Sequence, residues 1–361
     1  MLRQVLSFLC ALLIGLVAGE NAQATEAAQA NATTTWLGVI SGAAAASETV
    51  YASDMASLFP QGADLRVRPM LGDAGSGNLA SLLNDPHVDI AFIATDALAE
   101  AQTKEKGLGE KLELVARLSP QEVHILARAD IGALSDLTGR EVSVGPLGSA
   151  SAVTAAALFK ALGLKVEALN LDATAAIERL KQGAISAVVI VGGKPSPLVS
   201  AIPANAGIRL LPIPFGVPLE AAYLPTELEP GDYPNLIQSA GGVATVATGM
   251  ALLAAKAKND PGSEQRVANF VATVFPRFAE LQAEGRHPKW REVNLAASLP
   301  GFTRSRAAEA WLASRSELPA KPVAASAGAG PAPALADSLM STEQKEALFK
   351  RFIEWQRGKE R

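Results

Sequence analysis

Short apolar runs and Ala-rich amphipathic segments alternate along the first half of the chain. The first run, Trp36–Ile40, ends at Ser41-Gly42 and has the length of a buried strand. Tyr51, Met55 and Leu58 then recur at helical spacing, which predicts a helix. The pattern continues with a strand, a helix and a strand over Leu65–Pro69, Asn78–Leu83 and Val88–Ile93. Strands that alternate with helices predict a parallel α/β sheet.

The same order of elements recurs further along the chain. The run into Ser41-Gly42 resembles Val144–Ser151, and each is followed by an Ala-rich helix. Asp73-Ala74 resembles Asp172-Ala173, and Val88–Ile93 resembles the strand Ile185–Ile190. The three matches keep an offset of about a hundred residues, which is the size of a domain. Each single match is weak, because any two α/β units share such short stretches. The hypothesis of two similar lobes therefore rests on the shared order of the three matches.

The segments between and after the repeats predict how the lobes connect. Leu112–Leu118 and Glu122–Arg128 are strand-like, as is Val243–Leu253, and Pro261–Glu284 reads as a helix. If the chain returns to the first lobe, two segments cross between the lobes, and paired crossings permit hinge closure around a ligand. The predicted bounds are 35–127 with 235–316 for the first lobe and 128–234 for the second.

The two ends of the chain differ from the rest in composition. Arg3, the apolar run Val5–Ala18 and Ala22-Gln23-Ala24 predict a cleaved signal peptide over 1–24 and a protein of the periplasm. The run is shorter than the roughly 20 apolar residues of a membrane span, which disfavours an anchor. We expect a disordered leader over 25–34 and an Ala/Pro/Gly linker over 317–340. An amphipathic helix over 341–361 is expected to dock on its own protein or on a partner.

Composition excludes several classes of function. Cys10 is the only cysteine and leaves with the signal peptide, so the mature chain has no disulfide and no thiol nucleophile. The net charge of −4 gives no indication of the positively charged surface that nucleic-acid binding requires. His87, His124 and His287 have no metal-ligand spacing and no nucleophile beside them in sequence. The sequence therefore predicts no catalytic residue, no metal and no cofactor, and we expect a monomer.

Four turns that follow predicted strands carry small polar residues suited to a ligand. Their glycines let the backbone approach a solute closely, and free N–H groups at helix starts suit a carboxylate or phosphate. At any single turn, N-capping alone is the better explanation of such residues. The repetition favours a binding cleft for a small anionic solute, with Lys194 as the cation. The candidate residues are Ser41, Gly42, Ser47, Thr49, Gly75, Ser76, Asn78, Gly148, Ser149, Ser151 and Lys194.

Several of these stretches resemble the TAXI-type solute-binding proteins of TRAP transporters. The likeness runs from about Trp36 to Ser314 and rests on the order and spacing of its motifs, which are Gly75–Leu79, Val88–Asp96, Pro120–His124, Asp136–Gly145, Gly148–Ser151 and Gly231–Pro234. It implies a periplasmic-binding fold of type II, an organic acid or amino acid as ligand, and delivery to a membrane permease. Its motifs add Tyr51, Thr95 and Asp96 to the candidate ligand-binding residues. The first turn departs from the family, because Ala43–Ala46 replace its usual polar residues.

These observations favour an extracytoplasmic solute-binding protein over two alternatives. One alternative is a periplasmic sensor or adaptor that acts through the C-terminal helix. The other is an enzyme on the same fold, since a fold does not fix a function.

Overall fold

The computed structural model describes residues 35–316, apart from 239, 257 and 259. The predicted signal peptide, leader, linker and C-terminal helix (1–24, 25–34, 317–340 and 341–361) lie outside these residues. Within the described part, no helix has the length and apolar character to cross a bilayer.

The first repeat is a parallel βαβαβ unit. β1 lies between β2 and β3, and all three strands are parallel. Its elements are β1 (Thr35–Ile40), α2 (Ser47–Ala56), β2 (Leu65–Met70), α3 (Ser76–Asn84) and β3 (Ile90–Ala94), followed by α4 (Thr95–Lys104) and α5 (Leu108–Lys111). Every residue of β3 is buried, as expected for a parallel strand covered on both faces. The strands and helices predicted for this stretch are confirmed.

The second repeat has the same topology. β5 lies between β6 and β7, again all parallel, as β1 lies between β2 and β3. Its elements are η1 (Leu134–Leu137), β5 (Glu141–Ser143), α6 (Ala150–Ala161), β6 (Glu167–Leu169), α7 (Ala173–Lys181) and β7 (Ala187–Gly192). The shared strand order confirms the internal repeat. We keep the names first lobe and second lobe, and the residue bounds given for them above remain a prediction.

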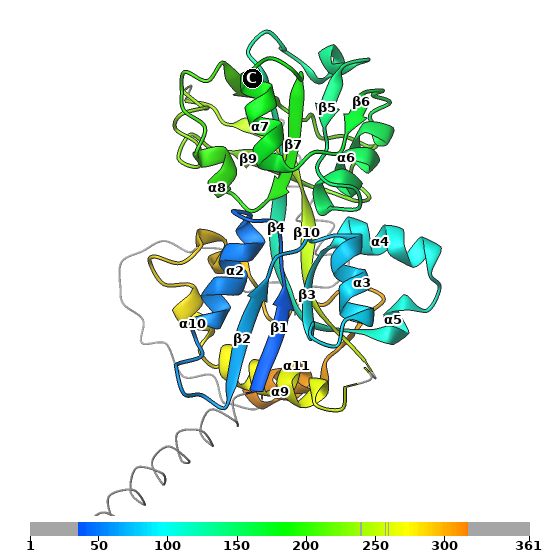
Figure 1. Cartoon of the computed structure of the whole chain (residues 1–361), viewed down its shortest axis with the longest axis vertical. Helices are drawn as coiled ribbons and strands as arrows, with labels where there is room; N and C mark the ends of the chain where they lie inside the picture. The colour runs from blue at the N-terminus through cyan, green and yellow to red at the C-terminus, as the bar shows by residue number, and fades with distance from the viewer. Residues whose placement is uncertain (1–34, 239, 257, 259, 317–361) are drawn as a thin grey trace, which may run out of the picture. The chain divides into compact units, whose positions relative to one another are not determined.

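Two long strands run side by side from one lobe into the other (Figure 1). They are β4 (Leu112–Arg128) and β10 (Val243–Ala255), and they are antiparallel. They join both lobes into one 11-stranded sheet of order β2-β1-β3-β10-β4-β7-β5-β6, with β8, β9 and β11 at its sides. The predicted parallel strands are confirmed within each repeat, and the crossing strands add an antiparallel pair between them. The two predicted crossover segments are confirmed.

The sequence predicted two strands where β4 is one continuous strand. Pro120 lies between the two predicted segments, and proline cannot donate a ladder hydrogen bond. In the structure Thr248 pairs with Gln121 and Met250 with Leu118, so the register shifts where the lobes meet. Proline is tolerated at such an irregularity because no ladder bond is lost there.

The rest of the described chain completes the two lobes. In the second lobe lie α8 (Pro197–Ser200), β8 (Ile208–Leu210) and β9 (Leu224–Leu228). The first lobe receives α9 (Ser263–Val274), α10 (Phe278–Leu281), η2 (Pro288–Glu292), β11 (Thr303–Arg304) and α11 (Arg306–Ser316). The predicted helix over 261–284 is divided around Pro276, which cannot continue the helical hydrogen bonds. Val267, Phe270 and Val271 of α9 join Leu37 and Val39 of β1 in one core.

Candidate functional site

A cavity of about 80 Å³ lies where the two lobes face each other. Its walls come from the turns after β1 and β2 in the first lobe, and from β5, β7 and the starts of α6 and α7 in the second. The carboxyl ends of parallel strands share one edge of a sheet, and this edge is where open α/β sheets bind ligands. The lining residues are Gly42, Ala43, Ala46, Glu48, Gly72, Asp73, Ala74, Ser143, Gly145, Pro146, Ser149, Ala150, Ser151, Asp172, Ala173, Val188, Val189, Ile190, Val191 and Leu198.

The lobes are in direct contact around this cavity. The Ser76 amide donates to the Gly148 carbonyl oxygen at 2.9 Å, and the Ala150 amide donates to the Asp73 carbonyl oxygen at 2.9 Å. A Cβ on Gly75 would lie 2.2 Å from the Gly148 carbonyl oxygen. Because that neighbour is backbone, only glycine permits so close an approach. The cleft is therefore closed in this structure.

Three of the candidates from the sequence line the cavity: Gly42, Ser149 and Ser151. Ser149 Oγ caps α6 by accepting a hydrogen bond from the Ala152 amide at 3.2 Å. Ser151 Oγ accepts one from the Val191 amide at 3.0 Å. Both hydroxyls therefore shape the wall of the cavity as well as facing it.

Three further candidates hold the turns of the first lobe in place. Asn78 is fully buried, and its Nδ2 donates to the carbonyl oxygens of Ser41 at 2.6 Å and Phe92 at 2.8 Å. Ser41 Oγ donates to the Met70 carbonyl oxygen at 2.9 Å. Thr49 Oγ1 bonds the carbonyl oxygens of Gly42 and Ala43. These side chains are structural supports for the turns after β1, β2 and β3.

Another group of candidates bridges the lobes. Ser76 Oγ donates to the Gly148 carbonyl oxygen at 3.1 Å, and Ser47 Oγ donates to that of Gly193 at 2.8 Å. Asp96 accepts from Thr154 Oγ1 at 2.6 Å, and burial raises the pKa of its carboxyl. These three contacts join the two lobes across the cleft.

Thr95 and Tyr51 lie beside the crossing strands. Thr95 Oγ1 accepts from the Gly249 amide at 3.0 Å, in β10. The Tyr51 hydroxyl lies 3.2 Å from Ser119 Oγ of β4, and burial raises the pKa of this hydroxyl. Neither residue lines the cavity.

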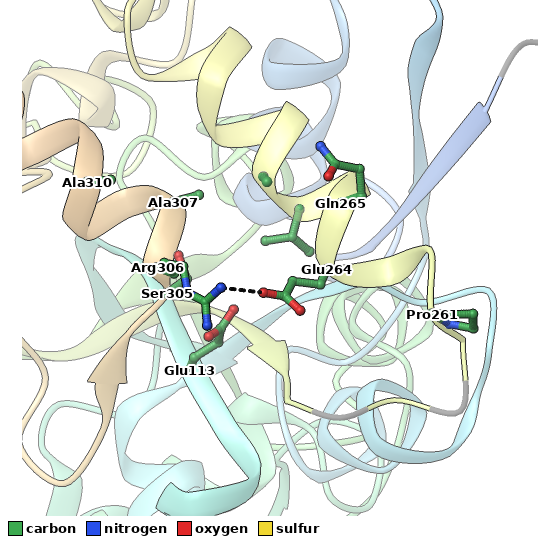
Figure 2. A pocket seen from close by; sticks show the side chains of 10 residues that line it. Glu113, Pro261, Glu264, Gln265, Ser305, Arg306, Ala307 and Ala310 are labelled. Atoms are coloured by element: carbon green, nitrogen blue, oxygen red, sulfur yellow. Dashed lines mark ion pairs between the residues drawn. The ribbon is translucent and has the colours of Figure 1, made fainter.

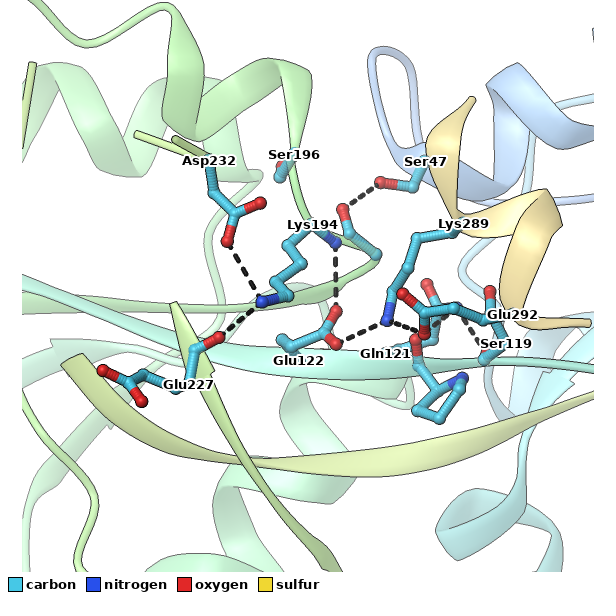
Figure 3. Close-up of polar contacts among 12 residues, drawn as sticks. Ser47, Ser119, Gln121, Glu122, Lys194, Ser196, Glu227, Asp232, Lys289 and Glu292 are labelled. Atoms are coloured by element: carbon cyan, nitrogen blue, oxygen red, sulfur yellow. Dashed lines mark hydrogen bonds and ion pairs between the residues drawn. The ribbon is translucent and has the colours of Figure 1, made fainter. Parts of the chain in front are cut away.

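Lys194 does not face the cavity. Its Nζ donates to the Glu227 carbonyl oxygen at 2.6 Å and lies 3.1 Å from Asp232 Oδ2 (Figure 3). Its charge is thus paired within the second lobe. The Lys194 amide donates instead to Glu122 Oε2 at 3.0 Å. The peptide between Lys194 and Pro195 is cis.

Four polar residues of the cavity were not among the candidates from the sequence: Glu48, Asp73, Ser143 and Asp172. Glu48 and Ser143 differ from the other two because each has an atom without a partner. Glu48 and Ser143 are each 1% exposed, and neither Glu48 Oε1 nor Ser143 Oγ has a hydrogen-bond partner. Burial raises the pKa of Glu48 to about 7. One feature of the sequence could have identified Glu48 as a candidate: it is the one charged residue between Ser41 and Ser53.

A buried ion pair lies beneath the cleft. Lys289 Nζ is 2.6 Å from Glu122 Oε1 and also 2.6 Å from Glu292 Oε2 (Figure 3). Lys289 comes from η2 of the first lobe, and Glu122 from β4 as it enters the second. The pair therefore joins the first lobe to the crossing strand.

Histidines and acids do not form a metal site in the described part of the chain. His124 Nε2 lies 2.7 Å from the Tyr233 hydroxyl, and burial lowers the pKa of His124 to about 4. Burial likewise lowers the pKa of His287 to about 4. Both rings are neutral at neutral pH.

A second, larger hollow of about 500 Å³ lies at the base of the first lobe, between α9 and α11 (Figure 2). Glu264 and Arg306 face each other there at 3.8 Å, and both side chains are exposed. No described residue with an unpartnered buried polar atom lines it. The smaller cavity between the lobes is therefore the better candidate site.

Residues 21–297 match the model of the NMT1-like family. Among solved structures, MatC from Rhodopseudomonas palustris with bound malate is 18% identical, covering 71% of this chain and 92% of that one, with a TM-score of 0.44. A TctC solute-binding protein from Polaromonas is 16% identical, covering 78% and 98%, with a TM-score of 0.40. A periplasmic transporter structure is 13% identical, covering 78% and 93%, with a TM-score of 0.48.

Proposed function

The chain belongs to the NMT1-like family, and on that premise we propose that it is a periplasmic solute-binding protein. It captures one small solute between its lobes and performs no reaction on it. The observation that carries the proposal is the cavity whose walls come from equivalent turns of the two repeats. Only closure of the lobes around a guest completes such a site.

The crossing strands support opening and closing. β4 and β10 are the two connections between the lobes, and their register shifts beside Pro120. A few residues at such a point can absorb the backbone rotation of a hinge. The contacts from Ser47 to Gly193 and from Ser76 to Gly148 then act as latches that form on closure.

The partner in this proposal is the permease of a membrane transporter. The resemblance to TAXI proteins supports a TRAP-type permease, and the predicted signal peptide supports export to the periplasm. In this proposal the permease recognises the closed form, because closure distinguishes the solute-loaded protein from the empty one.

The test is to recover the solute. The full chain is purified and denatured, and the small molecules released are identified by mass spectrometry. Added back at about 100 times its Kd, the solute stabilises the native state by about 3 kcal/mol and raises Tm by several degrees. Conversion of the solute to a product would contradict the proposal and indicate an enzyme.

A further inference from the structure

Glu48 is a buried acid that faces the cavity. It lies in the first turn of α2, is 1% exposed, and has no hydrogen-bond partner at Oε1. A buried ionised carboxylate is costly unless it is paired or bound to a cation. The protein therefore leaves one acceptor unsatisfied in a space that a guest can occupy.

The described residues around the cavity offer Glu48 no positive charge. The ionisable groups among them are Glu48, Asp73 and Asp172, all of them acidic. The buried cation Lys289 is already paired with Glu122 and Glu292. A cationic partner for Glu48 would thus have to come from the guest.

Ser143 supplies a second unsatisfied polar atom from the opposite lobe. It ends β5, is 1% exposed, lines the same cavity and has no partner at Oγ. A hydroxyl oxygen accepts hydrogen bonds, as does a carboxylate. One acceptor from each lobe favours a guest group with several N–H donors, which would hold both lobes at once.

Two of the helix starts at the cavity, those of α3 and α7, do not favour an anion. Asp73 accepts from the amides of Gly75 at 2.8 Å and Gly77 at 3.1 Å, at the start of α3. Asp172 accepts from the Thr174 amide at 2.9 Å, at the start of α7. Since carboxylates of the chain already occupy these N-termini, an anionic solute would meet like charge.

We propose that the captured solute carries a protonated nitrogen, as an ammonium or amidinium group, that pairs with Glu48 and donates to Ser143. The proposal rests on the solute-binding role given above and reverses the sign of charge that the sequence predicted. Ammonium and amidinium groups carry enough N–H donors to satisfy both atoms.

The first experiment uses acetamidinium, acetamide and acetate, which share one shape and differ in charge. Thermal unfolding of the full chain is measured with each compound at equal concentration. Acetamidinium is expected to raise Tm most, and acetate least. A larger shift with acetate, or no shift with any of the three, overturns the proposal.

The second experiment changes the acid alone. Glu48→Gln keeps the shape and removes the charge, and is expected to weaken acetamidinium binding by about tenfold or more. Glu113→Gln, which removes a half-buried acid in the other hollow, is the control and is expected to bind as wild type. Binding unchanged within about twofold in Glu48→Gln overturns the proposal.

The solute recovered from the purified protein separates this proposal from the one it rests on. A recovered solute with a basic nitrogen supports both. A recovered carboxylic acid without one overturns the cation proposal and leaves solute capture standing. If no solute is recovered and no probe binds, both the cation proposal and the proposal of solute capture are contradicted.

Discussion

Lys289 Nζ lies 2.6 Å from Glu122 Oε1, and both side chains are almost completely buried. The second oxygen of Glu122 accepts the Lys194 amide at 3.0 Å. One carboxylate thus contacts η2 of the first lobe and the loop after β7 of the second. This arrangement ties the base of the cleft to both lobes.

Removal of the Lys289 ammonium should destabilise the fold. Lys289→Met leaves Glu122 charged and buried without its partner, and we expect a loss of about 3 to 5 kcal/mol. Lys104→Met removes an exposed pair with Glu100 and should change stability by about 0.5 kcal/mol or less. Urea unfolding measures both. Equal losses in the two variants would show that the buried pair contributes nothing.

Gly75→Ala should keep the cleft from closing. The new Cβ would lie 2.2 Å from the Gly148 carbonyl oxygen and 2.8 Å from the Ala150 nitrogen, so the lobes must separate. We expect a larger radius of gyration by small-angle X-ray scattering, and weaker binding of the recovered solute. Gly231→Ala is the control, since its Cβ would meet no atom within 4 Å. Scattering and binding like wild type in Gly75→Ala would refute the close approach.

Asn78 should behave as a structural residue. Asn78→Ala leaves the carbonyl oxygens of Ser41 and Phe92 without their donor, and we expect a loss of about 3 kcal/mol. Asn84→Ala, which removes one exposed bond to Ala80, should cost about 0.5 kcal/mol or less. Chemical denaturation compares the two. If Asn78→Ala abolished solute binding at unchanged stability, Asn78 would be a ligand contact instead.

The raised pKa of Glu48 makes stability depend on pH. Between the ordinary pKa of 4.5 and the folded value of about 7, the unfolded chain has lost this proton and the folded chain retains it. Stability from this group therefore falls as pH rises through that window, by about 3 kcal/mol in full.

Glu48→Gln removes this dependence. We expect the variant to equal wild type near pH 4.5, to gain stability over it as pH rises, and to keep a constant advantage well above pH 7. The lowered pKa values of His124 and His287 act in the opposite direction between about 4 and 6.5, but they are common to both proteins and cancel. Urea unfolding across this range measures the difference. A difference that does not change with pH contradicts the burial of Glu48.

The fold was predictable from the sequence where local pattern determines it. Trp36–Ile40 and Val88–Ile93 are apolar runs of strand length, and their parallel pairing follows from the helices between them. The continuity of β4 through Pro120 was not predictable. It depends on the register shift opposite Gly249, which pairing with a distant strand creates.

The site was predictable only in outline. The turns at Gly42 and Ser149 were located because strand ends and small polar residues are local features. The direction in which a side chain points depends on residues that are distant in sequence. The Lys194 side chain pairs with Asp232, 38 positions further along the chain, and does not face the cavity. Glu48 lies in the first turn of α2 after an Ala-rich turn, and its neighbours in sequence gave no sign that it is buried.

Solute capture between the lobes is tested most directly by titration calorimetry with the recovered solute. Ala43 lines the cavity, whereas its neighbour Ala44 is exposed and does not. Ala43→Trp should fill the site and abolish binding, while wild type and Ala44→Trp should each bind one solute per chain. Binding by Ala43→Trp with the affinity of wild type would contradict a site between the lobes.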